Sequence, residues 1–239
     1  MARRSFVLVH GAYHGGWCWA RVAALLRLAG QRVLTPTHTG LGERRHLLSP
    51  AVTLETFIAD LVNALEFEEL EDVVLVGHSF AGNTITGAAD RCPERIRHLV
   101  YLDSMILESG EAPFDILPAS VVAERIRLAR ESSGGLSIPP PHPRAFGIPD
   151  GPDAEWVGRR MTPHPLATFT NRLRLAHPFG NGLRRTYLCC TDPIYGPLEA
   201  ARQRVKEKPG WDWREIRTGH DAMVTAPDEL ARMLIDLGG

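Results

Sequence analysis

Short apolar runs alternate with amphipathic helical patterns along most of this 239-residue chain. The runs at residues 6–9 and 73–76 are apolar throughout and rich in β-branched residues, which is typical of strands buried on both faces. This alternation predicts an α/β fold, a mainly parallel sheet of about six strands flanked by helices. Further strands are expected at 32–34, 98–103, 186–190 and 213–216. Helices are expected at 19–29 and 55–65, in the segment after residue 79 up to about residue 90, and at 198–206 and 227–237.

The regular alternation stops between residues 104 and 185. This segment holds one clear helical pattern, at 119–130, followed by a Ser-Ser-Gly-Gly stretch at 132–135 and a proline-rich run at 139–143. About 80 residues without strands, inside an otherwise regular α/β chain, indicate an inserted helical cap and not a plain loop. We therefore expect a core made of 1–103 and 186–239, and a cap, or lid, at 104–185.

Charge and hydropathy exclude several classes of function. A formal net charge of −1 argues against a nucleic-acid partner, because phosphates require a basic excess. The amino-terminal apolar run is too short for a signal peptide, and no stretch of about 18 apolar residues predicts a membrane span. The four cysteines lack metal-ligand or disulfide spacing, which favours the cytoplasm. We expect no metal and no cofactor, and a homodimer is left open.

A strand, a tight turn and a helix surround Ser79 in Gly77-His78-Ser79-Phe80-Ala81-Gly82. A nucleophilic serine has to stand above the sheet edge, and small residues two before and two after it allow the sharp turn that lifts it there. Gly77 and Ala81 hold those positions, with alanine in place of the more usual glycine. The same residues would also suit an ordinary turn, but strand 73–76 and the following helix favour a nucleophile.

Candidates for the base and the acid follow later strands. His220 lies between the last predicted strand and the last helix, where this arrangement places its catalytic histidine. The acid that orients it has two candidates: Asp192, after strand 186–190, and Asp103, at the end of strand 98–103. Asp192 precedes Pro193 and could simply form a turn. The order of a triad in this fold favours Asp192, with Asp103 as the alternative.

Two backbone amides are expected to form an oxyanion hole, which stabilises the charge that develops on a carbonyl oxygen. One belongs to Phe80, directly after the nucleophile, and the other to Ala12, in the loop after the first strand. Other residues near these loops are candidates to line a substrate pocket, although the tryptophan also suits core packing: Gly11, His14, Trp17 and His78.

Three segments carry a family resemblance: Phe6 to Ala12, His14 to Trp19, and the Gly-His-Ser turn. They resemble the methylesterase and hydroxynitrile lyase group of α/β-hydrolases and its bacterial esterase relatives, including pyrethroid-hydrolase-like enzymes. The segment at 39–44 is similar to the bacterial branch. The resemblance covers 5 to about 108 and 186 to 237, and it implies the α/β-hydrolase fold.

The resemblance also separates hydrolases from lyases. The lyases typically carry a hydroxyl residue where this chain has Gly11, and a lysine where it has Asp221. Both lyase marks are absent, which favours hydrolysis. At the acid, relatives commonly place the aspartate two or three residues after a threonine, whereas Asp192 follows Thr191 directly.

These features together predict a serine esterase that cleaves a small, largely apolar ester through an acyl-enzyme intermediate. Two other functions use the same pocket. One is a lyase or carbon–carbon bond enzyme that reuses the triad, and the other is a small-molecule receptor without useful turnover.

Overall fold

A computed structural model describes residues 3–239 of the chain, and its centre is one six-stranded parallel sheet. The strands follow the order β2-β1-β3-β4-β7-β8 across it. The predicted α/β-hydrolase fold, with about six mainly parallel strands, is confirmed. The strands are β1 (Ser5–Val9), β2 (Arg32–Leu34), β3 (Val73–His78), β4 (Ile96–Leu102), β7 (Arg184–Cys190) and β8 (Asp212–Ile216).

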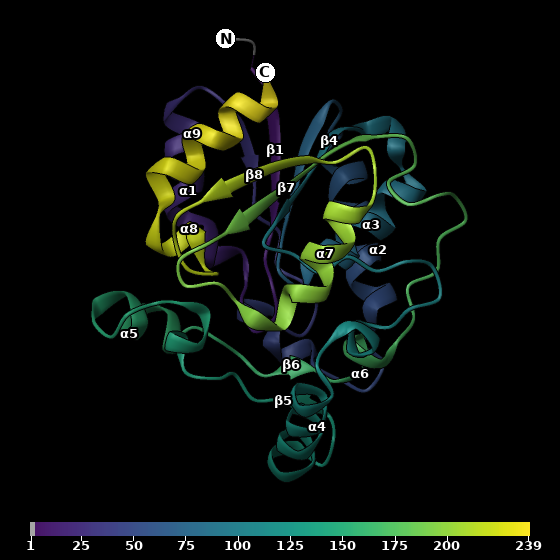
Figure 1. Ribbon diagram of the computed structural model, residues 1–239, viewed down its shortest axis with the longest axis vertical. Coiled ribbons are helices and arrows are strands. Elements are labelled where there is room, and N and C mark those ends of the chain that lie inside the picture. The colour runs from purple at the N-terminus through teal and green to yellow at the C-terminus, as the bar shows by residue number, and fades with distance from the viewer. Residues whose placement is uncertain (1–2) are drawn as a thin grey trace.

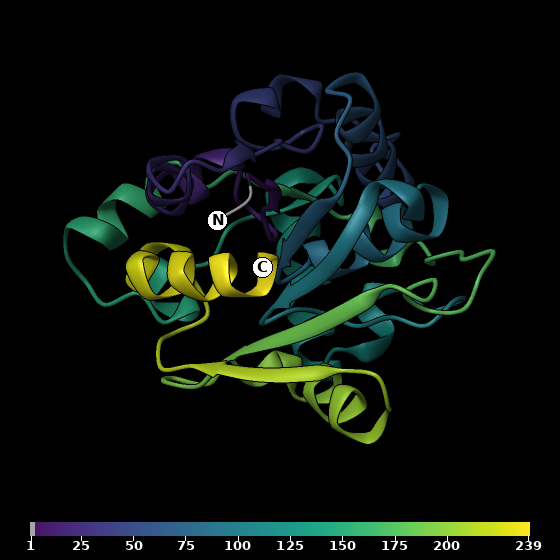
Figure 2. The same ribbon diagram turned by 90° about the horizontal axis from the view of Figure 1, so that it is seen from above.

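Helices cover both faces of the sheet (Figures 1 and 2). One face carries α1 (Ala20–Leu28), α8 (Ala222–Thr225) and α9 (Pro227–Gly238), and the other carries α2 (Leu54–Phe67), α3 (Ala81–Arg91) and α7 (Glu199–Glu207). Single 3-10 turns connect several elements: η1 (Gly16–Trp19), η2 (Gly42–Leu47), η3 (Pro93–Arg95), η4 (Pro113–Ile116), η5 (Pro143–Phe146) and η6 (Gly196–Leu198).

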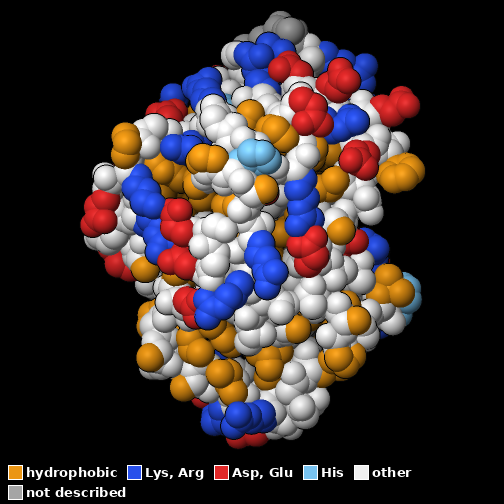
Figure 3. Space-filling model, turned by 90° about the vertical axis from the view of Figure 1, so that its right-hand side faces the viewer, with side chains coloured by type: hydrophobic (Ala, Val, Ile, Leu, Met, Phe, Trp, Pro, Cys, Tyr) orange, Lys and Arg blue, Asp and Glu red, His pale blue; other side chains and the backbone are white. Residues whose placement is uncertain are grey.

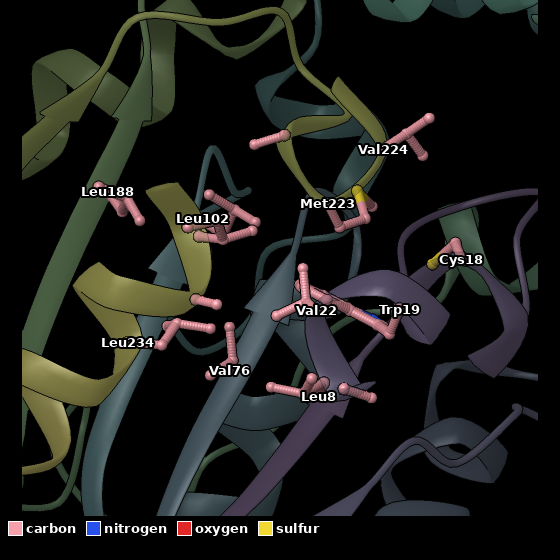
Figure 4. Close-up of a cluster of buried hydrophobic side chains, with 14 of the residues drawn as sticks. Leu8, Cys18, Trp19, Val22, Val76, Leu102, Leu188, Met223, Val224 and Leu234 are labelled. Atoms are coloured by element: carbon pink, nitrogen blue, oxygen red, sulfur yellow. The ribbon is translucent and has the colours of Figure 1, made fainter. Parts of the chain in front are cut away.

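The apolar strands bury side chains on both faces, as their uninterrupted apolar pattern predicts. Phe6 and Leu8 of β1 pack towards α1 and α9, whereas Val7 and Val9 pack towards α2 and α3. Alternate side chains of a strand point to opposite faces, so one run of four residues contributes to two cores. Figure 4 shows the first of these cores, where Leu8 lies close to Val22 of α1.

Residues 104–185 lie between β4 and β7, at the end of the sheet where the strands terminate (Figure 1). This segment holds α4 (Ala119–Ser133), α5 (Pro152–Gly158) and α6 (Ala167–Thr170). The expectation that it lacks strands is wrong in one detail, because β5 (Ser137–Ile138) pairs with β6 (His164–Pro165) in an antiparallel ladder. In Figure 3, apolar side chains gather over the lower part of the molecule, where this segment lies.

The four cysteines are free and buried, and Cys189 and Cys190 fill the sheet interior as small apolar side chains. Among residues 3–239, no helix has the length and apolar character that a membrane span requires.

Candidate active site

The turn between β3 and α3 holds Ser79 in a left-handed backbone conformation, with φ of 55°. This conformation is costly for a residue with a side chain, so the surrounding contacts have to maintain it. The Ser79 amide donates to the carbonyl of Leu102 at 3.1 Å. The Ser79 carbonyl accepts from the hydroxyl of Ser104 at 2.7 Å and from the amide of Met105 at 2.9 Å. The end of β4 therefore fixes the Ser79 turn.

Two glycines permit this close packing. A Cβ at Gly82 would stand 2.2 Å from the carbonyl oxygen of Met105, which leaves no room for alanine. A Cβ at Gly11 would stand 2.8 Å from Cβ of Ser79 and 2.9 Å from Nδ1 of His78. Gly11 thus lets the loop after β1 approach Ser79, and a side chain at that position would require the Ser79 turn or the His78 ring to shift.

Ser79, His220 and Asp103 form one continuous hydrogen-bonded chain. The Ser79 hydroxyl lies 2.9 Å from Nε2 of His220, and Nδ1 of His220 lies 2.6 Å from Oδ2 of Asp103. The side chains of His220 and Asp103 are 1% and 0% exposed. An aspartate on Nδ1 fixes the ring orientation and leaves Nε2 free to accept the serine proton.

The choice of Asp192 as the partner of His220 is wrong. Its carboxylate points into solvent with 59% of the side chain exposed, and it accepts from Nε of Arg217 at 3.1 Å. The Asp192 amide is held by the Thr218 carbonyl, which directs this loop along the end of β8 and away from His220. Asp103, the alternative candidate, occupies the position beside the histidine.

Two residues around the pair were missed by the sequence analysis. Arg202 of α7 is 3% exposed, and its Nη1 lies 3.5 Å from Oδ1 of Asp103. The Tyr195 ring stacks on the His220 ring, with centroids 4.1 Å apart. Arg202 was detectable in principle, because an arginine beside Ala201 on an otherwise apolar helix face is unusual. Tyr195 sits in an irregular loop that carries no pattern.

A small pocket opens over Ser79. Four of the predicted residues line it: Ala12, Phe80, His14 and His78. Gly11 and Trp17 do not. Gly11 packs behind the nucleophile. Trp17 stacks on the far side of His14, at 5.3 Å between ring centroids, and meets Trp156 edge-on.

A second, larger hollow lies outside the first, between α4 and the 139–141 proline run. Tyr13, Arg125, Tyr195 and Pro197 line both hollows and so form the boundary between them. We call the first the inner pocket and the second the outer groove. The boundary contains one cation, Arg125, which also lies over the ring of Phe169 at 4.9 Å.

Burial and neighbouring groups determine the protonation of the histidines around Ser79. Burial, and then the nearby His220, hold the pKa of His78 well below its ordinary value. The neutral His78 ring donates from Nε2 to the His220 carbonyl at 3.0 Å. One possible metal-ligand atom from each of His78, His220 and Asp221 lies within 4.8 Å of the other two. Both ring nitrogens of His220, however, are already bonded to Ser79 and Asp103. His78 and His220 are joined by the one hydrogen bond at the His220 carbonyl, whereas Asp221 binds His14.

The sheet order, the strained serine turn and the histidine loop define an α/β-hydrolase. The chain belongs to the alpha/beta hydrolase family, whose model matches residues 6–233. The resemblance to methylesterases and bacterial esterases is confirmed by its relatives. It is 43% identical to a carbendazim hydrolyzing esterase of Nocardioides sp. (strain SG-4G) over 98% of this chain and 99% of that protein.

The chain is also similar to a plant methylesterase in sequence and to a bacterial α/β-hydrolase in structure. The putative chloroplastic methylesterase 14 of Arabidopsis thaliana is 28% identical over 98% of this chain and 72% of its own length. An extracellular α/β-hydrolase from a Paenibacillus species superposes with a TM-score of 0.86 and 26% identity, covering 99% of each chain.

Proposed function

We propose that this carboxylic ester hydrolase uses Ser79 as its nucleophile, His220 as its general base and Asp103 as the carboxylate that orients His220. The observation that carries the proposal is the unbroken chain from the Ser79 hydroxyl to the Asp103 carboxylate, at 2.9 and 2.6 Å, beneath a pocket. The 43% identical esterase supports the reaction class.

In the first half of the reaction, the Ser79 oxygen attacks the ester carbonyl while Nε2 of His220 takes the hydroxyl proton. The tetrahedral intermediate then collapses, and His220 returns that proton to the departing alkoxide, which leaves as an alcohol. In the second half, His220 takes a proton from a water that attacks the acyl-Ser79 carbonyl, and it passes this proton to the Ser79 oxygen as the second tetrahedral intermediate collapses. The products are a carboxylic acid and the free serine.

The amides of Ala12 and Phe80 are the proposed oxyanion donors. Both residues line the inner pocket on either side of Ser79. Neighbouring amides have other partners, since that of Tyr13 donates to Nδ1 of His164 and that of Ser79 to Leu102. Removing one such donor typically costs about a hundredfold to a thousandfold in kcat.

The two hollows suggest where each group of an ester substrate binds. The inner pocket has room for one small group of an ester, and its walls are mainly aromatic and aliphatic, with Phe80, Phe146 and Phe169 among them. The outer groove takes the larger group against α4 and the proline run. We therefore propose an ester with one small group, which binds in the inner pocket, and one larger apolar group, which binds in the outer groove. Carbendazim is the first compound to test, because the 43% identical relative is named for it.

The cytoplasm is our proposed location, and the four free buried cysteines support it. Hydrolysis is favoured over lyase chemistry because Asp221, where lyases typically carry lysine, is bound to His14.

The proposal is tested with the wild-type enzyme and the Ser79→Ala variant. We expect the wild type to turn over p-nitrophenyl acetate, and a fluorophosphonate to label it once, at Ser79, as shown by peptide mass spectrometry. Ser79→Ala is expected to lose both. Labelling without turnover of any ester would favour the receptor, and release of cyanide or an aldehyde without ester turnover would favour the lyase.

A further inference from the structure

A second histidine–aspartate pair lies beside the nucleophile, apart from the proposed triad. Nε2 of His14 is 3.0 Å from Oδ2 of Asp221, and Nδ1 of His14 is 2.7 Å from the carbonyl oxygen of Ala12. The two side chains are 1% and 0% exposed, and both line the inner pocket. The mechanism proposed above assigns no role to this pair.

The hydrogen-bond partners determine where the protons are. A carbonyl oxygen can only accept, so Nδ1 of His14 has to carry a proton to bind Ala12. A carboxylate can also only accept, so Nε2 facing Asp221 requires a second proton. The arrangement is satisfied when His14 is an imidazolium and Asp221 is a carboxylate, a buried ion pair with good geometry.

We propose that His14 is a positioning residue: as an imidazolium anchored by Asp221, it holds the Ala12 carbonyl and so orients the loop that carries an oxyanion donor. The role in catalysis rests on the proposed esterase function, whereas the charge state of the pair does not.

The loop requires such an anchor because its backbone is strained. Tyr13, directly after Ala12, has φ of 69°, which is unfavourable for a bulky side chain. Three contacts hold this turn: His14 on the Ala12 carbonyl, His164 on the Tyr13 amide, and the Thr162 amide on the Tyr13 carbonyl. The His14 contact alone among the three carries a charge.

The groups facing the pair agree with this assignment. Burial lowers the pKa of His14, but the charge of Asp221 and the two hydrogen bonds more than offset it, so the pKa lies above its ordinary value. Burial acts to raise the pKa of Asp221, and the charge of His14 and their hydrogen bond bring it below its ordinary value. The other titratable groups near the pair are His10, Cys18, His78, His164, Cys190, Tyr195 and His220.

Nuclear magnetic resonance of the ¹⁵N-histidine-labelled protein tests the charge state. The His14 signals are assigned by their loss in His14→Gln. We expect both ring nitrogens of His14 to be protonated at pH 7, and Asp221→Asn to remove the proton from one of them. A wild-type spectrum in which Nε2 of His14 is unprotonated would overturn the proposal, because the proton would then reside on Asp221.

Kinetics tests the positioning role. We expect His14→Gln and Asp221→Asn to lower kcat about 10- to 100-fold with KM changed less than threefold, since oxyanion donors act mainly in the transition state. We also expect the wild-type kcat to decline at alkaline pH as His14 loses its proton, and this limb to disappear in Asp221→Asn.

His98→Gln is the matched control, because His98 is equally buried and bonds the Leu237 carbonyl and Thr186 far from the pocket. It is expected to lower stability and leave kcat and its pH profile unchanged. If the wild type hydrolyses esters but His14→Gln and Asp221→Asn keep its kcat, the positioning role is wrong. If the wild type hydrolyses no ester, the proposed function fails, while the charge state is still decided by resonance.

Discussion

Asp103 and Asp192 have opposite surroundings, although both lie just after a strand of the same sheet, β4 for Asp103 and β7 for Asp192. Asp103 is enclosed between His220 and Arg202, where burial and ordered partners fix its carboxylate. Asp192 is exposed and pairs with Arg217, an arrangement that contributes little in water. The position of the loop that carries His220 therefore determines which of the two aspartates contacts the histidine.

The Gly82 position gives a prediction at this scale. We expect Gly82→Ala to lower the free energy of unfolding by about 3 kcal/mol, because the added methyl overlaps the Met105 carbonyl. The Ser79 turn would shift with it, so activity should fall as well. Urea unfolding measures the first effect, with Gly196→Ala as the control because a Cβ there has open space. Equal stabilities for the two variants would contradict the packing argument.

Helix α4 contributes Arg125 to the boundary between the inner pocket and the outer groove, because this side chain lines both of them. We expect Arg125→Ala to join the hollows and to raise kcat/KM for p-nitrophenyl octanoate relative to the acetate by about tenfold. The control is Arg127→Ala, on the same helix but bound to Glu124 and Glu131 in solvent. An unchanged octanoate-to-acetate ratio in Arg125→Ala would show that this residue does not limit access.

The core elements could be predicted from the sequence because their patterns are local. Strand 32–34 was predicted with the bounds of β2, and Pro227 begins α9 as its position at a helix start indicates. Segment 104–185 was harder, since β5 and β6 are two residues each and form only by pairing across about 25 residues. The acid was harder for the same reason: its contact with His220 joins residues 117 positions apart.

The whole molecule carries several histidines that are buried and neutral, and these make its stability depend on pH. Burial holds the pKa of His10, His78 and His164 well below the ordinary value, and lowers the pKa of His38 to about 3. Below pH 6.5 these histidines bind protons in the unfolded chain but stay neutral in the folded protein, so the free energy of unfolding falls as the pH falls. His14 acts in the opposite sense, contributing stability below pH 6.5 that is lost as the pH rises through its raised pKa.

Urea unfolding at pH 7.5, 6.5 and 5.5 measures this balance. Each histidine that stays neutral changes the unfolding equilibrium about tenfold per pH unit. Five histidines have a lowered pKa once His98 is included, and the contribution of His14 changes little below pH 6.5, so we expect the unfolding constant to rise more than tenfold from pH 6.5 to 5.5. His38→Leu should reduce the slope by about one proton, because the side chain stacks on Phe57 and its ring nitrogens have no hydrogen-bond partner among the described residues. A flat profile would contradict the account.

The central claim is that Ser79 acts through His220 and Asp103, and a comparison of two isosteric variants tests it most directly. Asn replaces Asp at position 103 or at position 192, and kcat is measured on p-nitrophenyl acetate. We predict a fall of about 10⁴-fold for Asp103→Asn, because the amide no longer holds His220 in the tautomer that accepts the serine proton. Asp192→Asn should stay within twofold of the wild type. A collapse of kcat in Asp192→Asn, with Asp103→Asn still active, would contradict the account.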